Sequence, residues 1–327
     1  MIRKLAVAVL AVALFGVAAW TLSPWPAALV YRFLMDRGGV AMNDALAKHV
    51  PAGVVSLRDV AYDPTDAEAR LDLHRPATSE GRRLPMVVWV HGGAFLSGSK
   101  EQVANYLRII AADGYVTAGI GYGLAPRSRY PRPVQQLSAA LRFLDENAER
   151  FSIDASRIVL AGDSAGAQIA AQTSLVISSP DYAARMGLSA PIPRTSLRGA
   201  VLFCGFLDPD AIDTKGAFGG FLRTAIWSYF GTKDVSSDPR MAEFSIVKSL
   251  TAAFPPLFVS AGNADPLAAH SERLVRVASG KGVAVDSLFF PADRTPGLPH
   301  EYQFDLDTEA GRLARERLHA FLERRLR

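Results

Sequence analysis

The sequence predicts an α/β protein whose central sheet is mostly parallel and covered by helices on both faces. Short β-type runs alternate with helical patterns from Val54 onward, and several runs are continuously apolar, as strands buried on both faces are. The predicted strands cover residues 54–62, 71–75, 86–90, 116–122, 158–161, 199–204, 257–261 and 285–290. The predicted helices cover residues 102–112, 133–150, 165–177, 268–279 and 308–326.

Composition predicts one large domain with additions. The 327 residues are 49% hydrophobic, which is enough to bury a large core. The net charge of +4 comes from scattered cations without a basic run, so no nucleic-acid partner is expected. A single cysteine excludes an intramolecular disulfide, and Cys204 is interpreted as a buried core thiol. Six dispersed histidines contain no HExxH motif, so neither a metal nor another cofactor is expected.

Residues 1–22 are interpreted as an N-terminal anchor or signal segment. Arg3 and Lys4 precede 18 uncharged residues, from Leu5 to Leu22. That length favours an uncleaved membrane anchor, while the small residues at 17–19 also allow a cleaved export signal. An ordinary buried helix is the third interpretation. In either of the first two, the basic start places the body of the protein outside the cytoplasm.

Two segments interrupt the alternation of strands and helices. Residues 23–53 are predicted to form a linker and cap helices, with one helix over 27–35 and a second stretch after Gly38-Gly39. Residues 205–254 are too long for a plain loop and predict a helical lid inserted into the main domain, which covers 54–327. The aromatic residues of this lid either pack it onto the sheet or line a substrate site.

A serine stands where a buried strand turns sharply into a helix. The motif Gly162–Gly166 reads Gly-Asp-Ser-Ala-Gly and follows an apolar run that ends at Ala161. Such a strained turn needs glycines on either side and leaves the serine hydroxyl exposed at its tip. Ser164 is therefore the candidate nucleophile.

A serine nucleophile requires a base, and the base requires an orienting acid. Asp265 directly follows the predicted strand at 257–261, and His300 follows the strand at 285–290. Residues that follow parallel strands gather at one edge of the sheet, and the chain order Ser, Asp, His is that of the α/β hydrolases. Rival candidates are Glu301 and Asp293 for the acid and His270 for the base, which lies on a helix face.

Backbone N–H groups must also stabilise the oxyanion that forms during attack on a carbonyl. The loop His91-Gly92-Gly93-Ala94-Phe95 follows the strand at 86–90, and its glycines let the backbone approach a substrate. Gly92, Gly93 and Ala94 are the candidate oxyanion residues, together with Ala165 next to the nucleophile. His91 is expected to brace this loop rather than transfer protons.

Together with Tyr122–Pro126, Tyr130-Pro131 and Asp265–Leu267, these motifs resemble the bacterial hormone-sensitive-lipase-like esterases, which are α/β hydrolases. The resemblance covers residues 54–327. It implies an α/β-hydrolase fold and a serine carboxylesterase that works through an acyl-enzyme on Ser164. Ala94 departs from the family pattern, because the family has a third glycine at that position.

The expected activity is hydrolysis of short- to medium-chain acyl or acetyl esters. An amidase or formamidase and a lipase need the same three residues and remain alternatives, as does a non-catalytic binding protein on the same scaffold. A peptidase is less favoured because peptidases on this scaffold commonly carry a substantial extra domain. The expected partners are a small ester substrate and, through residues 1–22, a membrane. The sequence does not determine the natural substrate or the oligomeric state.

Overall fold

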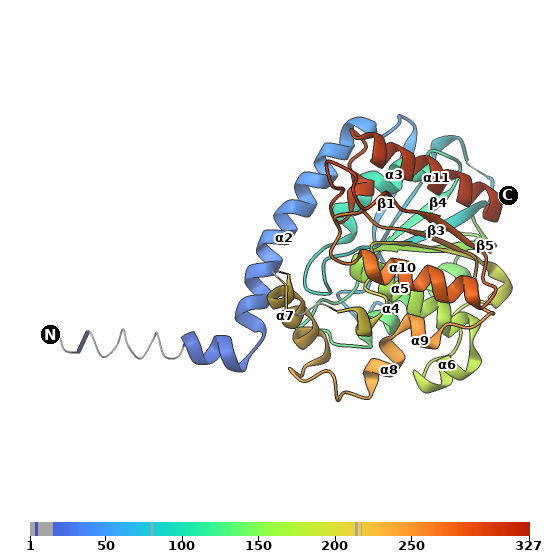
Figure 1. Cartoon of the computed structure of the whole chain (residues 1–327). Coiled ribbons are helices and arrows are strands. Elements are labelled where there is room, and N and C mark those ends of the chain that lie inside the picture. Colours follow the sequence, from blue (N-terminus) through green and yellow to red (C-terminus); the bar gives the residue numbers. More distant parts are fainter. Residues whose placement is uncertain (1–3, 6–15, 80, 213–214, 217) are drawn as a thin grey trace.

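A twisted sheet of eight strands forms the centre of the computed structural model, which describes residues 4–5, 16–79, 81–212, 215–216 and 218–327 (Figure 1). The strand order is β1-β2-β4-β3-β5-β6-β7-β8. β1 pairs antiparallel with β2, and β2 pairs antiparallel with β4, while the other neighbours are parallel. The strands are β1 (Val54–Ala61), β2 (Arg70–Pro76), β3 (Leu84–Val90), β4 (Val116–Ile120), β5 (Ile153–Asp163), β6 (Leu197–Phe203), β7 (Leu257–Ser260) and β8 (Val285–Leu288). The predicted α/β class with a mostly parallel sheet is confirmed.

Two layers of helices cover the sheet, because alternate side chains of each strand point to opposite faces. Met86 and Val88 of β3 pack on the face covered by α4, α5 and α10, whereas Val87 and Trp89 pack on the face covered by α3 and α11. Figure 1 shows these layers on either side of the strands. The helices of the two layers are α3 (Ala104–Ala111), α4 (Arg132–Glu146), α5 (Ser164–Ser178), α10 (Ala268–Gly280) and α11 (Glu309–Leu326).

Between β6 and β7, in the segment predicted as a lid, the described residues form three α-helices. They are α7 (Gly219–Phe230), α8 (Arg240–Phe244) and α9 (Ile246–Ser249). α7 packs beside α2 (Trp25–Leu46), where Tyr31 and Phe221 make an edge-to-face contact with ring centroids 5.0 Å apart. The short α6 (Pro180–Arg185) follows α5. α2 and α7 therefore lie side by side (Figure 1).

α2 is a single continuous helix, and the break predicted at Gly38-Gly39 is wrong. A side chain at Gly39 would overlap the side chain of Gln102, so this glycine lets α2 approach the main domain closely. The packing contacts of the helix outweigh the penalty of about 1 kcal/mol for glycine in a helix interior. The sequence pattern could not reveal this contact because Gln102 is distant along the chain.

Most of the predicted anchor lies outside the described residues, which include only 4–5 and 16–22 of residues 1–22. Within the described part of the chain, no helix combines the length and apolar character needed to cross a bilayer. Residues 16–22 are helical and continue away from the main domain (Figure 1).

Candidate functional site

Ser164 lies at a strained turn between β5 and α5. Its φ angle is +52°, in the left-handed region that residues with a side chain rarely adopt. Strain of this kind persists only where the surrounding structure enforces it, and it is concentrated at functional sites. Ser164 is also 7% exposed and lines a cavity. The structure therefore places its hydroxyl at the tip of the turn, next to open space.

Close packing of glycine backbone enforces the turn. A side chain at Gly166 would overlap the carbonyl oxygens of Val90 and His91, and one at Gly162 would lie 2.6 Å from the carbonyl carbon of Gly166. β5 and α5 can therefore meet the end of β3 only because both positions lack a Cβ atom. This contact fixes where α5 begins and, with it, where Ser164 lies.

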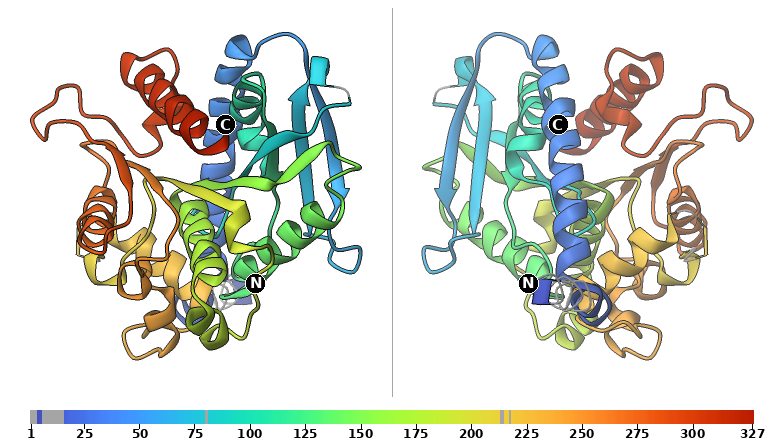
Figure 2. Two further views of the ribbon diagram at one scale, coloured as in Figure 1. Left: turned by 90° about the vertical axis from the view of Figure 1, so that its right-hand side faces the viewer. Right: turned by 90° about the vertical axis from the view of Figure 1, so that its left-hand side faces the viewer.

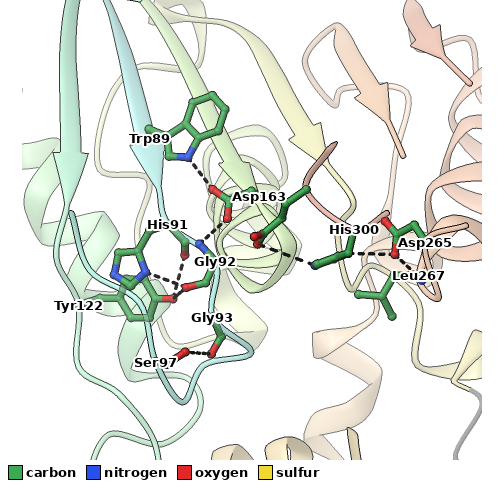
Figure 3. Close-up of polar contacts among 11 residues, drawn as sticks. Trp89, His91, Gly92, Gly93, Ser97, Tyr122, Asp163, Asp265, Leu267 and His300 are labelled. Carbon is green, nitrogen blue, oxygen red and sulfur yellow. Dashed lines mark hydrogen bonds and ion pairs between the residues drawn. The ribbon is translucent and has the colours of Figure 1, made fainter. Parts of the chain in front are cut away.

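Asp265 and His300 form a hydrogen-bonded pair at the end of the sheet (Figure 3). His300 Nδ1 lies 2.9 Å from Asp265 Oδ1, and the same oxygen accepts a hydrogen bond of 2.8 Å from the backbone N–H of Leu267. With Nδ1 donating to a carboxylate, the neutral ring carries its free lone pair on Nε2. Nε2 is the atom that could accept a proton from a substrate or from Ser164.

Cys204 lies against this pair and was not predicted as part of the site. Its Sγ, one Asp265 oxygen and one His300 nitrogen lie within 4.8 Å of one another. Burial opposes protonation of His300, but Cys204 and Asp265 together raise the pKa of His300 well above its usual value. Burial raises the pKa of the Cys204 thiol to about 11, so the thiol is neutral at pH 7.

The same three residues have the donor types of a metal site, but their chemistry does not favour one. Thiolate is the form of cysteine that binds metals, and the raised pKa of Cys204 works against it. A metal on His300 Nδ1 would also have to displace the hydrogen bond to Asp265. The arrangement fits a histidine held by a carboxylate better than a metal centre.

The loop after β3 contains three consecutive residues in the left-handed region of the backbone. Gly93, Ala94 and Phe95 all have positive φ angles, of 110°, 53° and 62°. Ala94 lines the cavity beside Ala165, whose N–H is near the free N-terminal end of α5. A left-handed residue with a side chain is strained, so Ala94 keeps the N–H of a glycine at some cost in stability.

The role predicted for Gly92 is corrected by the structure. Its N–H donates to Asp163 Oδ2 at 2.7 Å, so it is not free to bind an oxyanion. The donors that remain from the predicted set are those of Gly93, Ala94 and Ala165. Gly92 instead joins the loop to the end of β5 (Figure 3). The sequence could not reveal this contact because it depends on the pairing of β3 with β5.

His91 braces the loop, as expected. It is 2% exposed, its Nδ1 lies 2.8 Å from the carbonyl oxygen of Gly92, and its ring stacks on Tyr122 with centroids 4.3 Å apart. The Tyr122 hydroxyl donates to the His91 carbonyl oxygen at 2.9 Å. Burial lowers the pKa of His91 to about 4, so it stays neutral at physiological pH.

A pair of carboxyl groups, from the buried Asp163 and the partly exposed Glu301, lies beside Gly92, and the motifs did not predict it. Asp163 accepts hydrogen bonds from Trp89 Nε1 and Gly92 N, both at 2.7 Å. Glu301 has a φ angle of +61° and directs its carboxyl group toward the same space above Gly92. Burial and the nearby Glu301 charge raise the pKa of Asp163 well above its usual value. Glu301, a rival acid in the sequence, is thus a neighbour of Asp163, and its Oε1 lies 3.9 Å from His300 Nε2.

The other rivals lie elsewhere. His270 is buried on α10, where its Nδ1 accepts the backbone N–H of Asp208 at 3.1 Å. Asp293 is exposed on the loop before His300. Only Asp265, among the three acids considered, hydrogen-bonds to the His300 ring in the described chain.

One apolar cavity of about 710 Å³ joins the candidate residues. Ser164, Ala165, His300 and Ala94 line it, so the candidate nucleophile, the candidate base and part of the candidate oxyanion loop face the same space. Among the described residues no hydrogen bond joins Ser164 Oγ to His300; such contacts often tighten only when substrate binds. The remaining walls come from α2, α7 and the loops around them: Tyr31, Met35, Phe95, Phe206, Phe218, Gly220, Phe221, Leu222, Ala225, Ile226, Ala264, Pro266, Leu267, Pro299 and Glu301.

The aromatic residues between β6 and β7 divide between lining and packing. Phe206, Phe218 and Phe221 line the cavity. Tyr229 and Phe230 are instead buried in the core, where Tyr229 stacks on Phe95 with ring centroids 3.9 Å apart. Both interpretations of this segment are therefore correct, for different residues.

Comparison with known proteins gives related proteins and folds. Residues 87–303 match a family model described as the alpha/beta hydrolase fold. An acetyl esterase of Salmonella schwarzengrund is 27% identical over 198 residues, and Esterase LipC of Mycobacterium tuberculosis is 28% identical over 215 residues. These alignments cover 58% and 64% of this chain, and 58% and 51% of the relatives. The chain therefore spans little more than half the length of either relative.

Solved structures show the same fold. Esterase B from Lactobacillus rhamnosis superposes with a TM-score of 0.76 at 22% identity, covering 91% of this chain and 97% of the other. Identity this low supports the fold alone. The predicted resemblance to the hormone-sensitive-lipase-like branch is confirmed by the family match.

Gly166→Ala should destabilise the protein, because the new methyl group overlaps the Val90 and His91 carbonyl oxygens. Overpacking of this kind costs about 1–3 kcal/mol, which urea unfolding would measure. Gly38→Ala is the matched control: nothing lies within 4 Å of its new methyl group, and it should be neutral or stabilising. Equal stabilities of the two variants would contradict the packing argument.

Glu301→Gln should flatten the dependence of stability on pH. Because the pKa of Asp163 is raised in the fold, the folded state binds more protons than the unfolded state above pH 3.8, and stability falls as pH rises through that range. Removing the Glu301 charge lowers the pKa of Asp163 toward its usual value and reduces this loss. Urea unfolding at pH 5, 7 and 9 (~2-unit steps) would measure it. The control is Glu316→Gln on the exposed side of α11, which should keep the wild-type slope; an unchanged slope in both variants would refute the assignment.

Proposed function

The chain belongs to the α/β hydrolases, and from this premise we propose that it is a serine carboxylesterase acting on short- to medium-chain acyl esters. The observation that carries the proposal is the shared cavity, which holds Ser164 at its strained turn, the ring of His300 and the oxyanion loop. The hydrogen bond between His300 and Asp265 supplies the orienting acid. The names of the related acetyl esterases support an ester as the substrate.

In the proposed reaction, Ser164 Oγ attacks the ester carbonyl carbon and its proton passes to His300 Nε2. The tetrahedral intermediate collapses with cleavage of the bond to the leaving alcohol, which takes the proton from Nε2. Water then attacks the acyl carbon on Ser164 and gives a proton to His300 Nε2. This second intermediate collapses with cleavage of the bond to Ser164 Oγ, which takes the proton back from Nε2 as the carboxylic acid leaves. Asp265 holds the ring by Nδ1 and stabilises the imidazolium that forms in each step.

The free N–H groups of the oxyanion loop and of α5 would stabilise the negative oxygen in both intermediates. Gly93, Ala94 and Ala165 are the candidates, because Gly92 already donates to Asp163. In an apolar cavity a hydrogen bond to a developing charge is stronger than in water. Glu301 is close to this region, and its anionic form would oppose a nearby oxyanion.

The shape and composition of the cavity support an acyl substrate. Apolar side chains from α7 and α2 line most of it, and its volume of about 710 Å³ accommodates a ligand of modest size.

Residues 5–22 and the basic residues before them support attachment to a membrane, with the catalytic domain outside the cytoplasm. Release after cleavage of this segment is the alternative.

Ser164→Ala should reduce kcat for p-nitrophenyl esters by at least about a thousandfold, because it removes the attacking oxygen. The wild-type chain should also take one organophosphate adduct by intact mass, and the variant none. Ser178→Ala, which changes a buried serine of the same helix whose hydroxyl has no partner in the described chain, is the control and should keep activity. Wild-type turnover by Ser164→Ala would disprove the proposal.

Asp265→Asn should lower kcat/KM by about a hundredfold to ten-thousandfold and move its acidic limb to lower pH. The active ring is neutral, so activity rises with pH through the pKa of His300, which Asp265 helps to raise. Loss of the carboxylate charge lowers that pKa. A pH profile from 5 to 9 (~0.5-unit steps) would measure the shift. Asp293→Asn is the control, and a larger effect there would assign the acid role to Asp293.

A further inference from the structure

The outer face of α2 is apolar and exposed, which is the reverse of an ordinary surface helix. Phe33 and Leu34 are each 59% exposed, and Leu29, Val30 and Val40 are about as exposed. Trp20 and Leu22 extend the same character toward the N-terminus, with Leu22 81% exposed. In the described chain, large exposed apolar side chains outside this region are few: Val55, Leu57 and Phe218.

Three polar side chains of α2, those of Arg32, Asp36 and Asn43, face the protein, whereas Arg37 and Asp44 are exposed. Arg32 donates to the carbonyl oxygens of Leu96 and Ala125 at 2.6 and 2.8 Å. Asp36 Oδ1 accepts the N–H of Gly98 at 3.0 Å, and Asn43 pairs with Asn105 through two hydrogen bonds of 2.8 and 2.9 Å. These hydrogen bonds hold one side of α2 against the protein and leave its exposed apolar side chains toward the outside. Figure 2 shows that the helix runs along the outside of the molecule.

The apolar face adjoins the wall of the candidate active-site cavity. Tyr31 and Met35 of α2 line that cavity together with Phe218 and Phe221 of α7. Phe218 is itself 37% exposed, so the apolar surface continues from α2 onto α7. A ligand that moves from a surface in contact with α2 toward Ser164 would therefore pass along apolar walls.

We propose that the outer face of α2, defined by Leu29, Val30, Phe33, Leu34 and Val40, docks on the surface of a lipid bilayer. The face is continuous in the chain with the uncharged residues 5–22, which begin after two cationic residues. Arg37, whose guanidinium lies 5.0 Å from the Phe33 ring centroid, adds a cation on this helix. Lys233 adds a second cation farther toward the N-terminus, where it donates to the carbonyl oxygen of Thr21. Aromatic and cationic side chains at the edge of an apolar helix face are typical of interfacial helices.

This inference rests on the proposed function for its chemical consequence. With α2 at the interface, the cavity would receive acyl esters that reside in the bilayer, and the substrate class narrows to lipid-soluble esters. The reaction itself is unchanged, because neither Phe33 nor Leu34 lines the cavity.

A fluorescent probe on α2 tests the docking in the full chain. The chain has a single cysteine, Cys204, and it is buried, so Phe33→Cys can be labelled selectively with an environment-sensitive dye. Leu57→Cys on edge strand β1, where the native side chain is 48% exposed, is the matched control. The vesicles contain phosphatidylcholine and phosphatidylglycerol, with or without a doxyl-labelled lipid that quenches at shallow depth.

On binding to vesicles, the emission of the dye at position 33 should shift to shorter wavelength, and the doxyl lipid should quench most of it. The emission of the dye at position 57 should neither shift nor be quenched. A chain that sediments with vesicles but keeps the probe at 33 unquenched would overturn the proposal, because residues 1–22 alone would then hold it. A spectral shift that grows with protein concentration without lipid would also overturn it, in favour of a second copy on this face.

A kinetic comparison separates docking from the proposed activity. Phe33→Ser with Leu34→Ser should slow hydrolysis of a vesicle-embedded ester several-fold and leave p-nitrophenyl acetate turnover unchanged; Val55→Ser with Leu57→Ser should change neither. If the α2 variant hydrolysed both esters at the wild-type rates, the docking would be contradicted. A wild-type chain that docks but hydrolyses neither ester would instead refute the esterase proposal and leave the docking intact.

Discussion

The contact between the start of α5 and the end of β3 is the constraint on which the site depends. Gly166 lies against the carbonyl oxygens of Val90 and His91, where no Cβ atom fits. This approach sets the left-handed conformation of Ser164 and brings the loop after β3 beside the first N–H groups of α5. Ser164 and the candidate oxyanion donors are therefore positioned by one packing contact between two buried elements.

Electrostatics then divides the acidic groups of the site into separate roles. Asp265 is paired with His300, and this pairing favours the positively charged ring. Asp163 is hydrogen-bonded to Trp89 and Gly92 and raised in pKa by burial and by Glu301, so it serves the scaffold. One carboxyl group thus acts on the base, and the other holds the loop in place. Similar residue types perform different tasks because their surroundings differ in charge and burial.

The features that could be predicted from the sequence are local. The elbow at Ser164 follows from glycines at fixed offsets, and Asp265 and His300 follow from their positions just after apolar strands. The features that were missed depend on contacts between distant segments. The N–H of Gly92 donates to Asp163, and the two residues meet because β3 pairs with β5. Cys204 follows β6 and lies close to His300, which follows β8. At Gly39, α2 passes Gln102 without a break. Periodicity and spacing in a single sequence do not indicate such contacts, because the contacts arise only once the sheet has formed.

The inward hydrogen bonds of α2 have a mechanical consequence. Arg32 is bound to the carbonyl oxygen of Leu96, and Asp36 to the N–H of Gly98, so the helix grips both sides of the segment that closes the oxyanion loop. The carbonyl oxygen of Gly93 in turn accepts hydrogen bonds from the N–H groups of Leu96 and Ser97, each at 2.9 Å. A tilt of α2 would therefore displace this loop through the two hydrogen bonds.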